Sequence, residues 1–211
     1  MNKILNIETW KRKEHFQFFS QFKEPFFGIT AEVDCTNAHR YCKENNHSFF
    51  LYYHHKAITA VNSIEEFRYR IHNDDILIYD TIHTTTTISR DDNTFAFTFF
   101  PFKPAFSDYA ESAQTAISEV KKSGGLGLSE RSARLDVIHF TTIPWIHFTG
   151  ITHARDYKEN DSVPKIAFGK YIKKDGKITM PVSVHVHHGL MDGFHVGKFF
   201  NLFEELLNGS F

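Results

Sequence analysis

Alternation between apolar and polar residues is the clearest signal along this chain. Residues 26–34 carry Phe27, Ile29, Ala31 and Val33 at every second position, which is typical of a half-buried strand. Similar patterns predict further strands at residues 76–83, 84–89, 94–100, 136–142, 165–171, 177–180 and 182–187. The pattern therefore predicts a chain rich in strands.

Apolar residues at helical spacing predict helices between these strands. The predicted ranges are 8–20, 36–45, 49–63 and 106–122, and a strongly amphipathic last helix begins near Val196. Thr36 and Ser107 are predicted to cap two of these helices. Helices and strands in mixed order favour an α+β sandwich. With no repeat or long linker in 211 residues, we expect a single domain spanning residues 1–211.

The last predicted strand leads into a segment with candidate catalytic chemistry. Val182, Val184 and Val186 lie on one face, and a regular strand would put His188 on that face too. An imidazole held at the inner edge of a strand suits a general base, because its pKa lies close to neutral pH. The following Asp192-Gly193 pair has a plainer interpretation as a turn.

Three segments together carry a resemblance to a known family. The strongest runs from His187 to Phe200 and reads His-His-x-x-x-Asp-Gly-Phe-His-Val over its first ten residues. The others are Trp10–Phe16 and Ile143–Phe148, with weaker matches at Phe67–Ile71 and at Lys170-Tyr171. In order and spacing these segments resemble the type A chloramphenicol acetyltransferase family across nearly the whole chain.

The resemblance implies a reaction and a set of catalytic residues. It implies transfer of the acetyl group of acetyl-CoA to a hydroxyl of chloramphenicol, through a tetrahedral intermediate and without an acyl-enzyme. His188 would be the general base, and Thr141 would donate a hydrogen bond to the developing oxyanion. Asp192 would pair with Arg12 and have a structural role. Read without the resemblance, Thr141 is a threonine favoured by its strand propensity.

The resemblance also implies binding residues and an assembly. Phe18, Phe19 and His139 would contact the acceptor, and Tyr171 and Lys170 would contact CoA. The implied fold is a mixed-sheet two-layer sandwich of the CoA-dependent acyltransferase type, assembled as a homotrimer. Its sites would lie at subunit interfaces, with the pair of phenylalanines and the oxyanion donor facing the base of another copy.

The sequence departs from the family pattern at the acceptor and cofactor positions. Phe19 replaces a tyrosine, and Ala167 replaces a threonine that helps to hold a water near the oxyanion. Ser48 stands where a lysine lies near the CoA phosphates, and His139 and His185 replace an asparagine and a glutamine. Loss of a polar contact changes which acceptors a site favours. The same chemistry on a different small hydroxyl acceptor therefore remains an alternative, as does a binding protein that keeps the fold without catalysis.

Composition narrows the remaining classes of function. A net charge of -1 gives no basic field for nucleic acid and no basic segment for a membrane surface. The absence of a signal peptide or a long apolar run leads us to expect a cytoplasmic protein. Cys35 and Cys42 do not form a disulfide framework. The 14 histidines lack the ligand spacing of zinc enzymes, so no metal is expected. The 23 phenylalanines are assigned mainly to the core.

Overall fold

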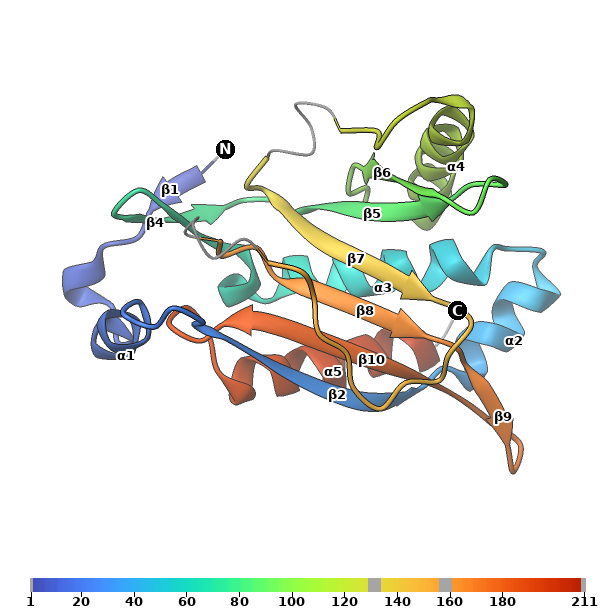
Figure 1. Ribbon diagram of the computed structural model, residues 1–211. Coiled ribbons are helices and arrows are strands. Elements are labelled where there is room, and N and C mark those ends of the chain that lie inside the picture. Colours follow the sequence, from blue (N-terminus) through green and yellow to red (C-terminus); the bar gives the residue numbers. More distant parts are fainter. Residues whose placement is uncertain (1, 129–133, 156–160, 210–211) are drawn as a thin grey trace.

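The computed structural model describes residues 2–128, 134–155 and 161–209 (Figure 1). In these residues the main sheet has seven strands, six of them in the order β2-β10-β8-β7-β5-β6, with β9 beside β10. Their bounds are β2 Phe26–Asp34, β10 Lys177–His187, β8 Lys165–Gly169, β7 Val137–Ile143, β5 His83–Ser89, β6 Phe95–Phe100 and β9 Ile172–Lys174. A small second sheet has the order β1-β4-β3, with bounds Asn2–Ile4, Asp75–Tyr79 and Tyr69–His72.

The main sheet is mixed. β5, β7 and β8 pair in parallel, whereas β10 pairs antiparallel with β2, β8 and β9. The helices are α1 Lys13–Phe19, α2 Thr36–Glu44, α3 Phe49–Ser63, α4 Phe106–Lys122 and α5 Gly193–Asn208, with short 3₁₀ helices η1 Ile7–Thr9 and η2 Glu65–Arg68. This arrangement confirms the predicted α+β class and mixed sheet. None of the helices in the described ranges is both long and apolar enough to cross a membrane.

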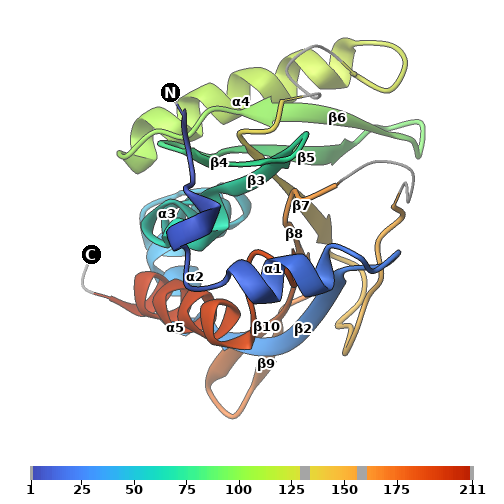
Figure 2. The same ribbon diagram turned by 90° about the vertical axis from the view of Figure 1, so that its left-hand side faces the viewer.

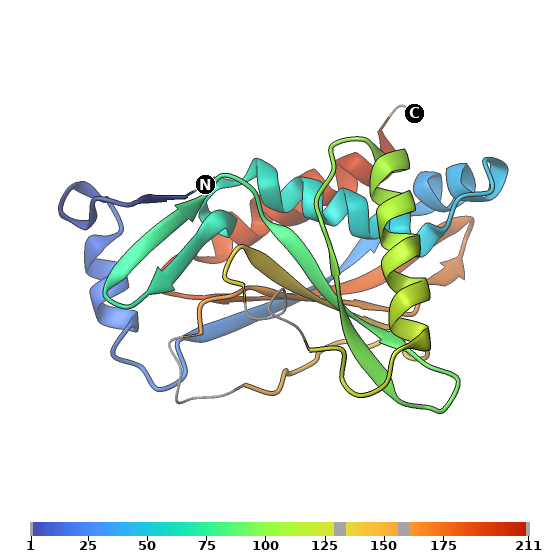
Figure 3. The same ribbon diagram turned by 90° about the horizontal axis from the view of Figure 1, so that it is seen from above.

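The two faces of the main sheet have different neighbours. Helices α3 and α5 lie on one side, and the segment 144–155 crosses the other side (Figures 2 and 3). We call these the helix face and the loop face. Val182, Val184 and Val186 belong to the core beneath the helices, so the alternate residues Ser183 and His185 point to the loop face.

Helix α3 is the central element of the core. Nine of its residues are buried, which agrees with its prediction as a helix that is apolar on most sides. Ser48 begins the helix, because its hydroxyl accepts a hydrogen bond from the backbone N–H of Leu51. On its buried side His54 contacts Thr142 of β7, and burial lowers the pKa of His54 to about 3, so this imidazole is neutral.

Pro181 explains why one strand was predicted as two. β10 runs unbroken from Lys177 to His187, and Pro181 pairs with Glu32 on one side. On its other side the partner changes: the pairing of β10 with β9 ends at Thr179, and its pairing with β8 begins at Val182. A proline is tolerated at this change of partner because no neighbour requires its missing N–H.

The predicted N-terminal helix was wrong in its extent. η1 and α1 replace a continuous helix over residues 8–20, and Trp10 between them is extended. Tertiary contacts explain the break, since the Trp10 ring packs against Phe16 and Tyr69 with centroids 6.1 and 5.8 Å apart. The strands β1, β3 and β9 were missed because segments of three or four residues are too short to show a period.

Two predicted caps were also wrong. Helix α2 begins at Thr36, whose hydroxyl donates to Asp34 rather than accepting from the helix. Helix α4 is preceded by Ala105, and the Ser107 hydroxyl donates to Asp108. In both cases the residue lies within the first turn of the helix rather than at the cap position, and its hydroxyl donates a hydrogen bond to a neighbouring carboxylate.

A buried arginine joins the small sheet to the main one. Arg70 in β3 is 0% exposed, and its guanidinium donates to the backbone carbonyls of Phe67, Tyr69, Leu135 and Val137. Two of these carbonyls belong to its own segment and two lie at the start of β7. The buried cation therefore satisfies carbonyls on both sides of this junction.

We predict that Arg70→Met destabilises the fold by about 3 kcal/mol or more, because the change leaves buried carbonyls without donors. Urea unfolding monitored by circular dichroism measures this difference. Arg40→Met on the exposed side of α2 is the matched control and is expected to stay within about 0.5 kcal/mol of wild type. Equal stability of the two variants would contradict the role given to Arg70.

Candidate active site

His188 lies directly after the end of β10, so the strand does not stay regular up to this residue. Its N–H donates to the Pro25 carbonyl at 2.7 Å, and its own carbonyl accepts from Arg12 at 3.2 Å. Its ring contacts Phe27, whose register partner is Val186. The His188 side chain thus emerges on the valine side, as expected, with its backbone held from two directions.

The His188 ring is stacked on Phe19. The two centroids are 3.9 Å apart and the ring planes differ by 10°. The Nδ1 atom of His188 is buried and has no hydrogen-bond partner among the described residues. This stacking corrects one expectation: Phe19 lies against His188 of its own chain rather than that of another copy. The reason is that α1 packs beside the end of β10, where Arg12 reaches the His188 carbonyl.

Arg12 and Asp192 form the predicted ion pair. Nη1 of Arg12 lies 2.5 Å from Oδ2 of Asp192, and the two side chains are 13% and 34% exposed. Partial burial by itself would raise the pKa of Asp192, but hydrogen bonding from Arg12 and the charges of His195 and Arg12 outweigh it and hold that pKa below its usual value. The pair fixes the turn 188–192, because Arg12 also binds the His188 carbonyl.

A second contact chain, missed by the sequence analysis, supports the same turn. Asp192 caps α5 by accepting from the N–H of Phe194, and the Asp192 N–H donates to Nδ1 of His195 at 3.1 Å. Nε2 of His195 lies 3.4 Å from Glu66 of η2, and the hydrogen bond from His195 lowers the pKa of Glu66. A capping box with histidine in place of glutamate or glutamine gave no recognisable signal.

Thr141 and His139 lie on the loop face of β7. The alternate residue Thr142 contacts α3, so these two side chains point away from the helices. His139 shares a hydrogen bond with Thr85, and burial together with Lys165 lowers the pKa of His139 to about 4. Ala167 lies opposite Thr141 on β8.

His188 and Thr141 are far apart within one chain. Thr141 pairs with Ala167, which pairs with Ser183 of β10. From Ser183 to the end of β10 beyond His187 the backbone advances roughly 16 Å, at about 3.3 Å per residue. The two side chains also start from opposite faces of the sheet. The structure therefore does not bring these two predicted catalytic residues together in a single copy.

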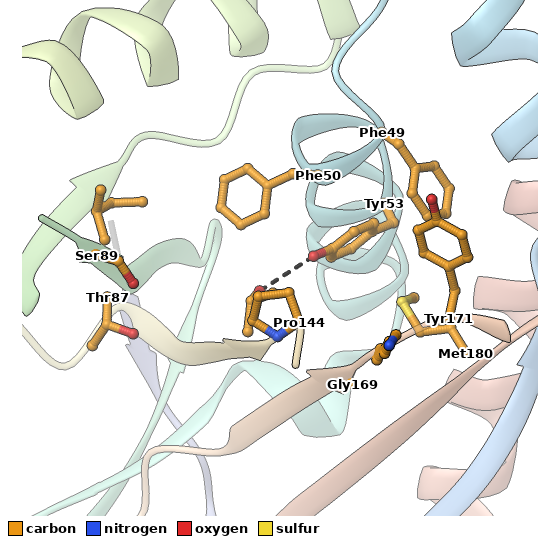
Figure 4. A pocket seen from close by; sticks show the side chains of 12 residues that line it. Phe49, Phe50, Tyr53, Thr87, Ser89, Pro144, Gly169, Tyr171 and Met180 are labelled. Carbon is orange, nitrogen blue, oxygen red and sulfur yellow. Dashed lines mark hydrogen bonds between the residues drawn. The ribbon is translucent and has the colours of Figure 1, made fainter. Parts of the chain in front are cut away.

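The predicted CoA residues line an apolar cavity at the other end of the sheet (Figure 4). Its volume is about 620 Å³, and Lys170 and Tyr171 form its wall beside Phe49 and Phe50 at the start of α3. The cavity lies where the parallel strands β5, β7 and β8 end, which is a common place for ligands in sheets of this kind. Ser48 is the residue just before this wall.

Comparison with known proteins identifies the fold and the family. The family model described as chloramphenicol acetyltransferase matches residues 1–204. The chain belongs to the chloramphenicol acetyltransferase family. The chloramphenicol acetyltransferase of Staphylococcus aureus is 31% identical over 209 residues, covering 97% of this chain and 94% of that protein. Chloramphenicol acetyltransferase 3 of Escherichia coli is 24% identical over 210 residues, covering 97% and 96%.

Solved structures agree with this assignment. A structure named chloramphenicol acetyltransferase superposes with a TM-score of 0.91 at 34% identity, covering 98% of this chain and 100% of that one. A probable dihydrolipoamide acetyltransferase from Listeria monocytogenes has a TM-score of 0.68 at 14% identity, covering 92% and 88%. This second likeness shows the fold alone. The acyltransferase-type fold and the acyltransferase family are thus both established for the chain.

In this family member the predicted residues fall into three groups. Arg12, Asp192, Phe19 and His188 meet at the end of β10. Phe18 is 58% exposed beside Phe19, so it forms the rim of this group. Thr141 and His139 form the loop-face group, and Lys170 and Tyr171 form the cavity group. No three histidine, cysteine or acidic side chains in the described part of the chain are placed to hold a metal.

We predict that Arg12→Met lowers stability by about 1.5–3 kcal/mol at pH 7, because Asp192 loses its charged hydrogen-bond donor. The folded-state pKa of Asp192 is lowered, so the pair stabilises the fold above about pH 4 and this contribution is lost as pH falls through the lowered pKa. Urea unfolding of wild type and variant at pH 7 and in acid measures the difference.

Lys13→Met is the matched control, since Lys13 pairs with Glu8 at an exposed position where an ion pair contributes about 0–1 kcal/mol. A stability gap between wild type and Arg12→Met that stays constant down to pH 3 would count against Asp192 as the partner responsible.

Proposed function

We propose that this chain transfers the acetyl group of acetyl-CoA to a hydroxyl of chloramphenicol. The proposal depends mainly on the fixed position of His188 in a chain of this family. Its backbone is held by hydrogen bonds with Pro25 and Arg12. The relatives named for this reaction match nearly the whole chain. A general base needs a positioned imidazole nitrogen within reach of the acceptor hydroxyl, and the His188 ring, held against Phe19, meets the first condition.

A residue of the chain is assigned to each step of the proposed acetyl transfer that needs one. His188 takes the proton of the acceptor hydroxyl, whose oxygen attacks the thioester carbonyl carbon of acetyl-CoA. The tetrahedral intermediate carries an oxyanion, to which the Thr141 hydroxyl donates a hydrogen bond worth about 2.7–4 kcal/mol of barrier. Collapse of the intermediate breaks the carbon–sulfur bond and returns the proton to the CoA thiolate. Arg12 and Asp192 position the base by fixing its turn.

Acetyl-CoA is assigned to the apolar cavity as a cosubstrate. Tyr171 is 39% exposed there and packs against Phe49 and His39, so part of its ring remains accessible for stacking with an adenine. Lys170 lines the same cavity and supplies a cation for a phosphate. With no lysine at Ser48, this chain has one cation fewer for the phosphates than the family pattern, which predicts weaker binding of CoA.

The separation of His188 and Thr141 supports a site shared between copies. We propose a homotrimer in which the base of one copy acts beside the loop face of the next. Trp145 and Ile146 on the loop-face segment are 68% and 59% exposed, and such apolar side chains are typical of a surface that another copy covers. We also propose a cytoplasmic location, where the two buried, free cysteines stay reduced.

A second acceptor remains a candidate function, and a specific observation favours it. Phe19 lies directly on the base but lacks the hydroxyl expected there, and Ala167 offers no hydroxyl beside Thr141. The same chemistry on another small hydroxyl compound would follow if chloramphenicol is turned over poorly while other alcohols release CoA.

We predict that wild-type protein releases thiol from acetyl-CoA in the presence of chloramphenicol and that His188→Ala lowers this rate at least 100-fold. A thiol-trapping dye measures the release. The matched control is His72→Ala, an exposed histidine in β3, which is expected to retain the wild-type rate. Turnover by His188→Ala comparable to wild type would remove His188 from the role of base.

We predict that two inactive variants complement each other. The variants His188→Ala and Thr141→Ala carry different tags and are assembled together. We expect about a quarter of the wild-type rate, because in a random mixture about a quarter of the interfaces combine an intact His188 from one copy with an intact Thr141 from the next. Mixing His188→Ala with the double variant is the control, since no intact site forms. Mixed assemblies that stay inactive would argue for a site within one copy.

A further inference from the structure

His147 connects β2 to the wall of the apolar cavity. The residue belongs to the segment 144–155, which crosses the loop face, and its imidazole contacts two other parts of the chain. Nδ1 lies 2.9 Å from the backbone carbonyl oxygen of Lys170, and Nε2 lies 2.8 Å from Oε1 of Glu32 in β2. Lys170 lines the cavity, whereas His147 and Glu32 lie behind it. None of the functional roles assigned above uses this chain of contacts.

The segment that bears His147 also holds the cavity wall. The backbone N–H of Lys170 donates to the carbonyl of Ile146 at 2.8 Å, and the Lys170 carbonyl faces His147. Pro144 of the same segment lines the cavity together with Lys170 and Tyr171 (Figure 4). The place of Lys170, and of Tyr171 directly after it, therefore depends on how this segment is held.

Both partners of the His147 ring are hydrogen-bond acceptors. A carbonyl oxygen and a carboxylate have no proton to donate, so each ring nitrogen needs its own N–H. A neutral imidazole carries one N–H and satisfies one partner, whereas an imidazolium carries two and satisfies both. The carbonyl of Lys170 and then the carboxylate of Glu32 raise the pKa of His147 above its usual value, although burial acts in the opposite direction.

Glu32 is the charged group that governs the state of His147. On β10, Pro181 lies opposite Glu32 and Ser183 lies further along the same face, and neither side chain titrates. Lys170, which follows β8, contributes its carbonyl and brings one cation to the same region. In the described part of the chain, Glu32 is the charged group that shifts the pKa of His147. Deprotonation of the ring thus leaves either Glu32 or the Lys170 carbonyl without a donor.

We propose that protonated His147 is a positioning residue for Lys170 and Tyr171 and makes the binding of CoA depend on pH. The inference rests on the proposed function, which assigns CoA to this cavity. In the imidazolium form His147 ties the Lys170 carbonyl to Glu32 and so to the edge strand β2. As pH rises through the raised pKa of His147, one of the two hydrogen bonds is lost, and the cavity wall is held less firmly.

The test measures the dissociation constant of CoA at about pH 6 and about pH 9, by calorimetry on the full-length protein without an acceptor. The matched variant is His147→Asn, whose amide keeps a donor for the Lys170 carbonyl but does not titrate. Binding by wild type is expected to weaken about three- to fivefold more than binding by this variant, because the lost bond is partly exposed. An equal change in the two proteins would overturn the proposal.

Glu32→Gln separates positioning by the imidazolium from a merely structural role. The glutamine amide donates to an unprotonated Nε2, so a neutral ring satisfies both partners by keeping its one proton on Nδ1. This variant is expected to lose the extra pH dependence of wild type and to keep tight binding at about pH 9. A pH dependence as large as that of wild type would overturn the proposal.

Nuclear magnetic resonance follows the ring directly, through the histidine signal that His147→Asn removes. That signal is expected to titrate at higher pH in wild type than in Glu32→Gln. Titration of the ring at the same pH in both proteins would contradict the role given to Glu32 and overturn the proposal. Unchanged urea unfolding shows that both variants are intact.

Failure of the proposed function gives a different result. If chloramphenicol causes no thiol release while CoA binding shows the expected pH dependence, the proposed acceptor is contradicted and the role of His147 is supported. If wild type binds no CoA at either pH, the assignment of the cavity to CoA and this inference are both overturned.

Discussion

The pairing of β10 with β2 determines where every other part of the site lies. Nine register pairs from Thr179 to His187 fix which side chains of β10 point to the helices and which to the loop face. The valines meet α3 and α5, whereas Ser183 and His185 line the opposite side. A shift by one residue would exchange these two sets and bury the imidazole of His185 under the helices. The end of this pairing also determines where His188 leaves the sheet.

This arrangement divides the chemistry among separate parts of the chain. The proposed base His188, the proposed oxyanion donor Thr141 and the apolar cavity with Tyr171 each occupy a different region of the same mixed sheet. A sheet of this kind cannot bend to bring its ends together, because its interior is close-packed. The proposed roles of His188 and Thr141 therefore require the proposed assembly, in which neighbouring copies supply the missing half of each site.

Much of the fold could be predicted from the sequence, since β2, α3 and α4 have strong periods and their bounds are those predicted. The Arg12–Asp192 contact also agrees with expectation. Tyr171 lines a cavity, and its contact with CoA stays a prediction. The stacking of Phe19 on its own His188 and the Glu66–His195 contact could not be predicted. They depend on how segments distant in sequence pack together, and no local pattern encodes that. Pro181 misled the strand prediction because its tolerance depends on which neighbours flank it.

The ion pair between Arg12 and Asp192 links positions 180 residues apart in the chain. Closing so long a segment carries a large entropic cost that only the finished sheet can offset. During synthesis Arg12, which lies just before α1, emerges early, and its partner Asp192 follows only when almost the entire chain has left the ribosome. This pair can therefore fix the turn at residues 188–192 only late in synthesis, and an incompletely folded chain has not yet positioned the proposed base.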